Sequence, residues 1–519
     1  MKRFAISTTG VATAALLFGS AYAADLRVGM GAETTSIDPH YFAGFGNIQI
    51  DLAVFGHLVN YDSKFRITPG LAESWKPIDD KTWEFKIRSN AKWHDGSPVT
   101  VDDVIHTFKR IPETGLKQFA VYVVDKQIVK IDDKTFHIKT QVANPLVPNN
   151  MAAFALASKK HSEGLTTEDF NSGKAAIGAG PFKFVEWLKG DRLVLTANPD
   201  YWAGKPGFDK VTLKPIASGA SRVASILSGE VDMIEKVPPA DIAKLKQNAN
   251  LTVVQTPSCR VMMLHPDASR ETSPYVTGLD DKPIRNPFRD SRVRMAVSKA
   301  INREAIVSRV LDGNGVPASQ HTAPGLFGHN PNIKIEAYDP AGAKKLLADA
   351  GYGNGFKLTI HGTNDRYDND GQILEALGQM LTQVGIQTKV EPLSLTVFFG
   401  RLYSKIEFSL AMAGNCPGTA EASSSLKEFV ATYNAADGYG IYNAHRYSNP
   451  RIDAMIKEAV STIDDAKREK LFQGALAAAI ADGVPIPLHQ QMNTWALKKG
   501  LTYEARTDEM TLVQFARPN

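Results

Sequence analysis

Alternating apolar and polar side chains predict the first strands of this chain. Within 82–88 every second residue is apolar and the others are polar or charged, which is the period of a half-buried strand. Two further apolar runs, 128–131 and 135–138, flank a short Asp-rich turn and predict a strand pair. Between these strands, Thr100 followed three residues later by Asp103 predicts a capping box that starts a helix at the next residue.

The C-terminal half has the pattern of a parallel α/β sheet. Asp339 followed by Pro340 predicts the start of one helix, and Asn449 followed by a proline predicts another. Between them, 356–361 reads as a strand, 373–384 carries a helical apolar stripe, and 386–390 reads as a strand again. Strand, helix and strand over so few residues indicate a βαβ crossover and hence a parallel sheet. Ligands of such sheets bind beyond the carboxyl ends of the strands.

The N-terminus has the pattern of a secretory signal peptide. Lys2 and Arg3 precede an apolar stretch over 4–18, and small residues follow at Ala21 and Ala23. These features predict cleavage after Ala23 and export to the periplasm. No cysteine stands at the cleavage site, which argues against a lipid anchor. No later stretch reaches the roughly 18 apolar residues of a membrane-spanning helix.

Composition changes this picture in two respects. The chain has 519 residues, too many for one small core, so two or three lobes are expected. Its 59 basic and 55 acidic residues are mixed along the chain, and without a basic arm no nucleic-acid partner is expected. The two cysteines, Cys259 and Cys416, are expected to be buried free thiols, with a disulfide as the alternative because export permits one.

Motifs of catalysis are missing. The sequence contains no phosphate-binding lysine loop, no GxSxG elbow, no HExxH helix and no CxxC pair. The histidines are scattered along the sequence. His94 stands beside an Asp-Gly turn, so we interpret it as a turn residue rather than a metal ligand. We therefore expect a binding protein and not an enzyme, with no catalytic residue, no metal and no cofactor.

An ordered series of short motifs resembles the peptide/nickel/opine-type periplasmic solute-binding proteins, solute-binding protein family 5 of ABC importers. The series runs through Ser36-Ile37-Asp38-Pro39-His40, Pro69-Gly70-Leu71-Ala72-Glu73-Ser74-Trp75, Trp93-His94-Asp95-Gly96-Ser97-Pro98, Asn198-Pro199-Asp200-Tyr201-Trp202 and Ala300-Ile301-Asn302-Arg303. Each motif by itself is modest, but their common order over the mature chain is specific.

The resemblance implies an α/β fold: a two-lobed periplasmic-binding-protein trap with an additional third lobe, built of mixed sheets flanked by helices. After the signal peptide (1–23), lobe I is expected to comprise 24–58, 178–270 and 488–519. Lobe II, the additional lobe, is expected over 59–177, and lobe III over 271–487. Lobes I and III would close on the ligand, because contacts made only in the closed form shift the population toward it.

The function that the resemblance implies is capture of an oligopeptide or peptide-like solute and its delivery to an ABC permease in the inner membrane, by a monomer. An opine, a metal chelate, haem or an oligosaccharide is the alternative ligand within the family. From other classes, a secreted hydrolase would need a nucleophile–base pair that the sequence does not nominate. A periplasmic chaperone would need an open apolar surface.

Candidate ligand contacts are Arg260 on an expected strand near the hinge, and Arg366 with Tyr367 in the loop after the strand that ends at His361. An arginine in a closed cleft suits a carboxylate through paired donors. The further candidates are Asn415, Glu421, His489 and Trp495, the last of which could equally belong to a core.

One departure from the family concerns the amino terminus of a peptide ligand. Peptide-binding members often place an aspartate after a short strand of lobe III to pair with that amine. Here the corresponding stretch, 413–421, contains no aspartate, and Glu421 is the nearest acid. Glu421 either contacts the ligand or caps the helix that follows it.

Overall fold

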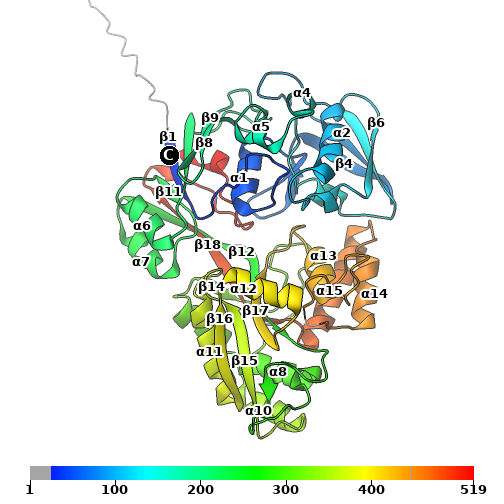
Figure 1. Cartoon of the computed structure of the whole chain (residues 1–519), viewed down its shortest axis with the longest axis vertical. Coiled ribbons are helices and arrows are strands. Elements are labelled where there is room, and N and C mark those ends of the chain that lie inside the picture. The colour runs from blue at the N-terminus through cyan, green and yellow to red at the C-terminus, as the bar shows by residue number, and fades with distance from the viewer. Residues whose placement is uncertain (1–24, 445) are drawn as a thin grey trace, which may run out of the picture.

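The computed structural model describes residues 25–444 and 446–519, so the proposed signal peptide lies outside the described residues. Two lobes form the upper part of the molecule in Figure 1 and a third lies below them. Each has its own cluster of buried apolar side chains. The expected α/β architecture of a two-lobed trap with an additional lobe is confirmed. Among the described residues, no helix combines the length and apolarity that crossing a membrane requires.

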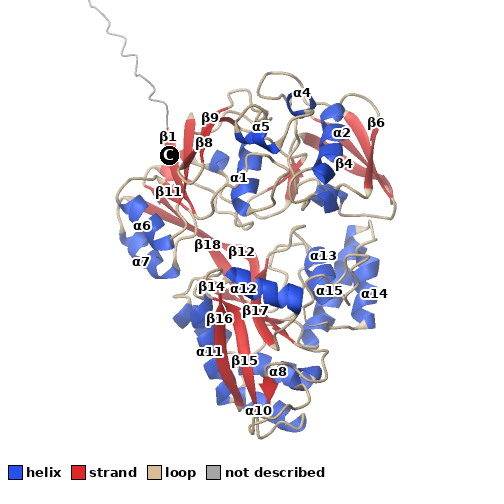
Figure 2. Ribbon diagram, viewed as in Figure 1, coloured by secondary structure: helices blue, strands red, loops and turns tan. Residues whose placement is uncertain are grey.

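A twelve-stranded mixed sheet runs through lobes I and III, in the order β13-β15-β17-β12-β18-β11-β1-β10-β9-β8, with β14 paired to β18 and β16 to β15. Figure 2 shows helices covering it in both lobes. In lobe I its strands are β1 (Asp25–Met30), β8 (Phe182–Leu188), β9 (Arg192–Ala197), β10 (Lys210–Pro215) and β11 (Met233–Ile234). The helices of this lobe are α1 (Phe45–Val54), α6 (Gly219–Leu227) and α7 (Pro239–Gln247).

In lobe III the parallel crossover predicted from the sequence is confirmed. Strands β15 (Phe356–Thr363) and β16 (Ile386–Leu393) pair in parallel, and α11 (Asp370–Gln383) connects them. The other strands are β13 (Val276–Thr277), β14 (Gly315–Pro317) and β17 (Leu410–Asn415). The other helices are α8 (Ser291–Ala300), α9 (Arg303–Ala305), α10 (Pro340–Asp349), α12 (Leu395–Phe399), α13 (Ala422–Ser425), α14 (Pro450–Ala459) and α15 (Asp465–Ala481).

Lobe II contains a separate antiparallel sheet in the order β4-β5-β7-β6. Its strands are β4 (Ala72–Asp79), β5 (Thr82–Ile87), β6 (Lys126–Lys130) and β7 (Thr135–Thr140), accompanied by the pair β2 (Val59–Tyr61) and β3 (Ile67–Pro69). The expected capping box is present, because Thr100 and Asp103 bond reciprocally at the start of α2 (Val101–Arg110). The short helices are α3 (Val147–Asn150), α4 (Lys159–Ser162) and α5 (Thr167–Asn171). His94 bonds to the backbone of 178–180 in lobe I, as expected of a residue that holds a turn.

Two long antiparallel strands join lobe I to lobe III. They are β12 (Leu251–Pro266) and β18 (Ile486–Lys498), which pair along most of their length with register shifts near the middle. The last residues of β12 also pair with β17 of lobe III, whereas the C-terminal part of β18 pairs with β11 of lobe I. Neither strand therefore belongs to one lobe alone, and Figure 1 shows both crossing between the lobes.

The expectation of two free thiols is wrong, because Cys259 and Cys416 form a disulfide with a Cα–Cα separation of 4.9 Å. The antiparallel pairing of β12 with β17 sets Val261 opposite Asn415. The residues just beyond this pair, Cys259 and Cys416, therefore lie side by side despite a sequence separation of 157. Strand pairing created this proximity, which the cysteine spacing alone did not reveal.

Candidate functional site

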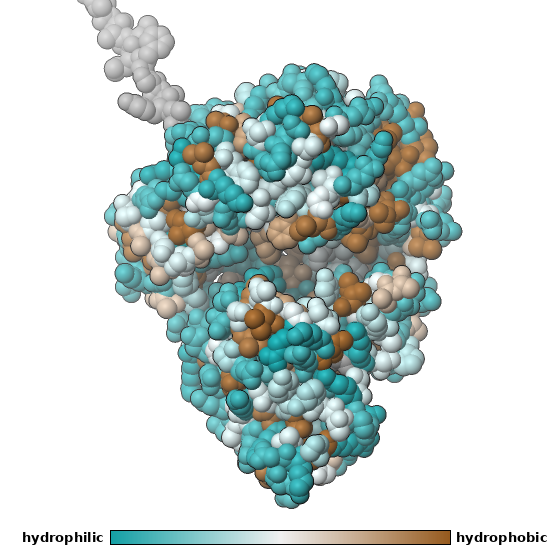
Figure 3. All heavy atoms as spheres, viewed as in Figure 1, coloured by the Kyte–Doolittle hydropathy of each residue, from teal (hydrophilic) through white to brown (hydrophobic). Residues whose placement is uncertain are grey.

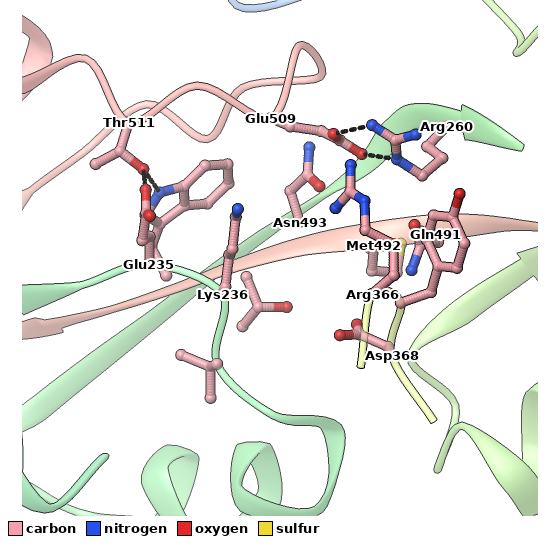
Figure 4. A pocket seen from close by; sticks show the side chains of 14 residues that line it. Glu235, Lys236, Arg260, Arg366, Asp368, Gln491, Met492, Asn493, Glu509 and Thr511 are labelled. Carbon is pink, nitrogen blue, oxygen red and sulfur yellow. Dashed lines mark hydrogen bonds and ion pairs between the residues drawn. The ribbon is translucent and has the colours of Figure 1, made fainter. Parts of the chain in front are cut away.

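A polar pocket of about 100 Å³ lies where the crossing strands meet lobes I and III. Its walls come from the backbone after β11, the middle of β12 and β18, the loop after β15 and the C-terminal segment of the chain (Figure 4). The residues that line it are Glu235, Lys236, Val237, Arg260, Arg366, Tyr367, Asp368, Gln491, Met492, Asn493, Thr494, Trp495, Glu509 and Thr511. Four of the seven candidate residues, Arg260, Arg366, Tyr367 and Trp495, are among them.

Arg260 is tied to the C-terminal segment by a two-pronged ion pair. Its Nε donates to Glu509 Oε1 at 2.8 Å, and a terminal nitrogen donates to Glu509 Oε2 at 2.7 Å. The Ser258 hydroxyl donates to the same carboxylate at 2.8 Å. Burial opposes ionisation of Glu509, but Arg260 outweighs it and leaves the pKa of Glu509 lowered. The charge of Arg260 is therefore already neutralised, so its main effect is to fix one wall of the pocket.

The loop after β15 is held in place by a single carboxylate. Asp370 Oδ2 accepts hydrogen bonds from the Thr363 hydroxyl at 2.6 Å and from the backbone N–H groups of Arg366 and Tyr367 at 3.1 and 3.2 Å. The Tyr367 hydroxyl lies within hydrogen-bonding distance of the backbone of Gly414 in β17. These bonds explain why a polar loop presents two side chains at a defined place in the pocket.

The side chain of Arg366 has no ion pair and no hydrogen bond among the described residues. Its guanidinium lies 5.2 Å from the centre of the Tyr367 ring. Its two neighbouring acids, Asp365 and Asp368, form no ion pair with it. Asp365 instead accepts a backbone hydrogen bond at the start of α12, at 2.8 Å. Burial, and then the nearby charge of Arg260, lower the pKa of Arg366. A partly buried cation without a protein partner can receive an anionic group of a ligand.

Two more charged side chains of the pocket have few protein partners. Lys236 forms no ion pair among the described residues, and its amino group lies 5.3 Å from the centre of the Phe45 ring. Asp368 receives one long hydrogen bond, from Asn314 Nδ2 at 3.5 Å. Burial, and then the charge of Glu509, raise the pKa of Asp368 to about 6.

Trp495 belongs to the pocket wall and to a core at once. It is 2% exposed and packs in the apolar cluster of lobe I. Its indole N–H donates to the Thr511 hydroxyl at 2.9 Å, and that hydroxyl in turn bonds to the carboxylate of Glu235. The donor group of Trp495 is therefore used inside the protein.

The structure does not bring Asn415, Glu421 and His489 to this pocket. Asn415 donates to the Ser425 hydroxyl at 2.8 Å. His489 is 1% exposed, and burial lowers its pKa to about 4. At His489, β18 pairs with β12 on one side and with β14 on the other, and this central position, which alternation along one strand does not predict, leaves the residue in the interior.

Glu421 is buried in lobe III, and its proposed contact with the ligand stays a prediction. It occupies the residue before α13, but its side chain makes no capping hydrogen bond. Instead, both carboxylate oxygens accept from Arg468 of α15 at 2.9 Å in the interior of lobe III. Burial raises the pKa of Glu421 against the opposing effect of Arg468. The acid nearest to the missing aspartate is thus committed to a structural ion pair.

A larger cavity of about 760 Å³ opens beside the polar pocket and shares Arg260 with it. It lies between lobes I and II and the lobe III loop 416–418, and Figure 3 shows a hollow with apolar side chains around it between the upper lobes and lobe III. Its wall includes Phe45, Leu52, Phe119, Tyr122 and Trp202. The arrangement can hold a charged end of a ligand in the polar pocket and an apolar body in the cavity.

Sequence reasoning missed four charged residues of the pocket, Glu235, Lys236, Asp368 and Glu509. The loop of Asp368 was available as a signal, because it is the same loop that nominated Arg366. Lys236 and Glu509 lie far apart in the sequence, and only the fold of lobe I brings them to one place.

The comparisons with known proteins agree with this architecture. Residues 66–437 match the model of bacterial extracellular solute-binding proteins, family 5. The glutathione-binding protein GsiB of Pectobacterium atrosepticum is 28% identical over 94% of this chain and 93% of its own length. The periplasmic oligopeptide-binding protein OppA of Salmonella typhimurium is 25% identical, with coverages of 94% and 93%. The solved structure of HbpA2 from Haemophilus parasuis superposes with a TM-score of 0.81 at 22% identity, covering 95% of this chain and 100% of that one.

Proposed function

Because this chain belongs to the bacterial extracellular solute-binding proteins of family 5, which bind peptides or small ligands and work with ABC permeases, we propose that its own ligand is a peptide-like solute with a free carboxylate. The relatives are named for binding glutathione and oligopeptides, which supports this class. Members of the family are binding proteins and not enzymes. We further propose that the protein is exported to the periplasm, acts as a monomer and delivers the ligand to a permease of the inner membrane.

The observation that carries the proposal is the unpaired Arg366 in a pocket between lobes I and III. Its guanidinium is partly buried, no carboxylate of the described residues lies at bonding distance from it, and Asp370 fixes the loop that presents it. An arginine of this kind binds a carboxylate through two parallel N–H donors. Because Lys236 and Glu509 come from lobe I and Arg366 from lobe III, a ligand held at Arg366 would contact both lobes.

Calorimetric titration of purified protein with glutathione, trialanine and trialanine amide tests this proposal. We expect glutathione or trialanine, which both carry a free carboxylate, to bind. Trialanine amide should bind more weakly than trialanine. Arg366→Ala should weaken binding by about 2–5 kcal/mol and leave unfolding of the ligand-free protein nearly unchanged. The exposed Arg451 on α14 supplies the control variant Arg451→Ala, which should alter neither quantity. A loss of stability with affinity preserved would contradict the proposed role of Arg366.

A further inference from the structure

Three acids line the polar pocket, and two of them are already engaged. The Glu235 carboxylate accepts from the backbone N–H of Gly31 at 2.7 Å and from the Thr511 hydroxyl. The Glu509 carboxylate is occupied by Arg260. Asp368 has only the 3.5 Å hydrogen bond from Asn314 and no ion pair within the described part of the chain. It is therefore the acid of this pocket that is available for a ligand.

The free charges of the pocket have both signs. Figure 4 shows Lys236 on one side of the pocket and Arg366 with Asp368 on the other. Arg366 and Asp368 stand two residues apart on the same loop, and both line the pocket. Within the part of the chain that the structure describes, two cations (Lys236 and Arg366) and one acid (Asp368) have no close partner of opposite sign. A ligand end that carries an anion and a cation close together would supply partners to both kinds.

The electrostatic surroundings of Asp368 favour the approach of a cation. Burial, and then Glu509, raise its pKa to about 6, whereas Lys236 and Arg222 act in the opposite direction without restoring the ordinary value. A carboxylate left in such an environment is unfavourable for the ligand-free protein. Groups perturbed in this way cluster at functional sites, where a ligand supplies the missing charge.

We propose that Asp368 binds the ammonium group of the ligand while Arg366 and Lys236 bind a carboxylate attached to the same carbon. The ligand class is then one with an α-amino acid head group, such as a peptide linked through a side-chain carboxyl, whose body extends into the apolar cavity. An ordinary α-linked peptide carries its ammonium and its carboxylate at opposite ends, so a small pocket with both kinds of free charge suits it less well. This inference rests on the proposed function and makes it more specific.

The test compares two probes that differ in one ammonium group. γ-Glutamylalanine carries the complete head group, and glutarylalanine lacks only the ammonium. By calorimetry, wild-type protein should bind γ-glutamylalanine at least about tenfold more tightly than glutarylalanine. Asp368→Asn should remove that preference by weakening γ-glutamylalanine alone, and Arg366→Ala should weaken both probes.

The matched control is Asp365→Asn, which changes an exposed carboxylate of the same loop that does not line the pocket. It should leave both affinities unchanged. Equal affinity of the two probes for wild-type protein, or an equal loss for both in Asp368→Asn, would overturn the inference. Binding of trialanine without binding of γ-glutamylalanine would overturn it while leaving the proposed function intact. Binding of none of the peptide probes would overturn both.

Discussion

At the scale of single residues, the charged side chains near the cleft and in lobe III differ in whether the fold already pairs them. Arg468 and Glu421 form a pair in which both partners are buried, and buried Arg260 pairs with the largely covered side chain of Glu509. Removing one partner of such a pair leaves the other uncompensated, so both pairs are expected to be structural. Arg366 and Asp368 lack such partners, which is the expected distinction between a ligand contact and a scaffold residue.

Asp368→Asn is predicted to stabilise the ligand-free protein at pH 7.5. The pKa of Asp368 in the folded protein is about 6, above the ordinary value of 3.8, so the folded state binds the proton more tightly than the unfolded state. The stabilisation that comes from this tighter proton binding is therefore present below about pH 4 and is lost as the pH rises through about 6. The asparagine cannot ionise, so we expect a gain of up to about 3 kcal/mol at pH 7.5 that shrinks toward pH 4.

Urea unfolding of wild-type and Asp368→Asn protein at both pH values measures this difference, with Asp365→Asn as the reference variant. A uniform loss of stability at the two pH values would instead indicate that Asp368 supports the fold. Together with the binding titrations, a variant that is more stable and binds less would identify a residue kept for the ligand.

At the scale of elements, the disulfide joins β12 to the loop after β17. This loop, 416–418, forms part of the wall of the apolar cavity. Closing a loop across 157 residues restricts the unfolded chain, and the chain-entropy relation gives a stabilisation of about 5 kcal/mol.

Replacing both cysteines, Cys259→Ser with Cys416→Ser, should therefore lower the melting temperature by several degrees. Calorimetric scans of this variant, and of wild-type protein with and without reductant, measure the effect. Reductant should lower the wild-type transition toward that of the variant and leave the variant unchanged. Identical transitions for all of them would show that the crosslink contributes little to stability.

At the scale of the whole molecule, lobes I and III are joined by the long strands β12 and β18, and the polar pocket lies beside this crossing. The pocket takes Lys236 and Glu509 from one lobe and Arg366 and Asp368 from the other. A ligand that binds both sides favours the closed arrangement by its differential affinity. Saturating γ-glutamylalanine should thus decrease the radius of gyration measured by small-angle X-ray scattering.

In the same scattering experiment, Arg366→Ala at the same probe concentration should keep the larger radius, because the probe would no longer saturate it. Arg451→Ala should contract as wild-type protein does. Contraction without probe binding, or full occupancy by calorimetry without contraction, would contradict closure driven by the ligand.

Local patterns by themselves determined much of the secondary structure. The alternation over 82–88 became β5, and the Thr100–Asp103 capping box starts α2. The predicted strand, helix and strand over 356–390 correspond to β15, α11 and β16, and the two strands pair in parallel. These features depend on residues near one another in the sequence, so period, caps and turns suffice to predict them. The ordered motifs also indicated the family, and with it the α/β trap with an additional lobe.

Which charged side chains meet depends on contacts between distant parts of the chain. The pairing of β12 with β17 brought the cysteines together, α15 brought Arg468 to Glu421, and the C-terminal segment brought Glu509 to Arg260. Arginine and glutamate occur both in structural ion pairs and in binding sites, so the residue type alone does not distinguish the two roles. What distinguishes them is whether a partner lies within bonding distance after folding, and partners separated by dozens to hundreds of residues leave no local pattern. Arg366 and Asp368 have no such partner among residues 25–444 and 446–519, and this property identifies them as candidate ligand contacts.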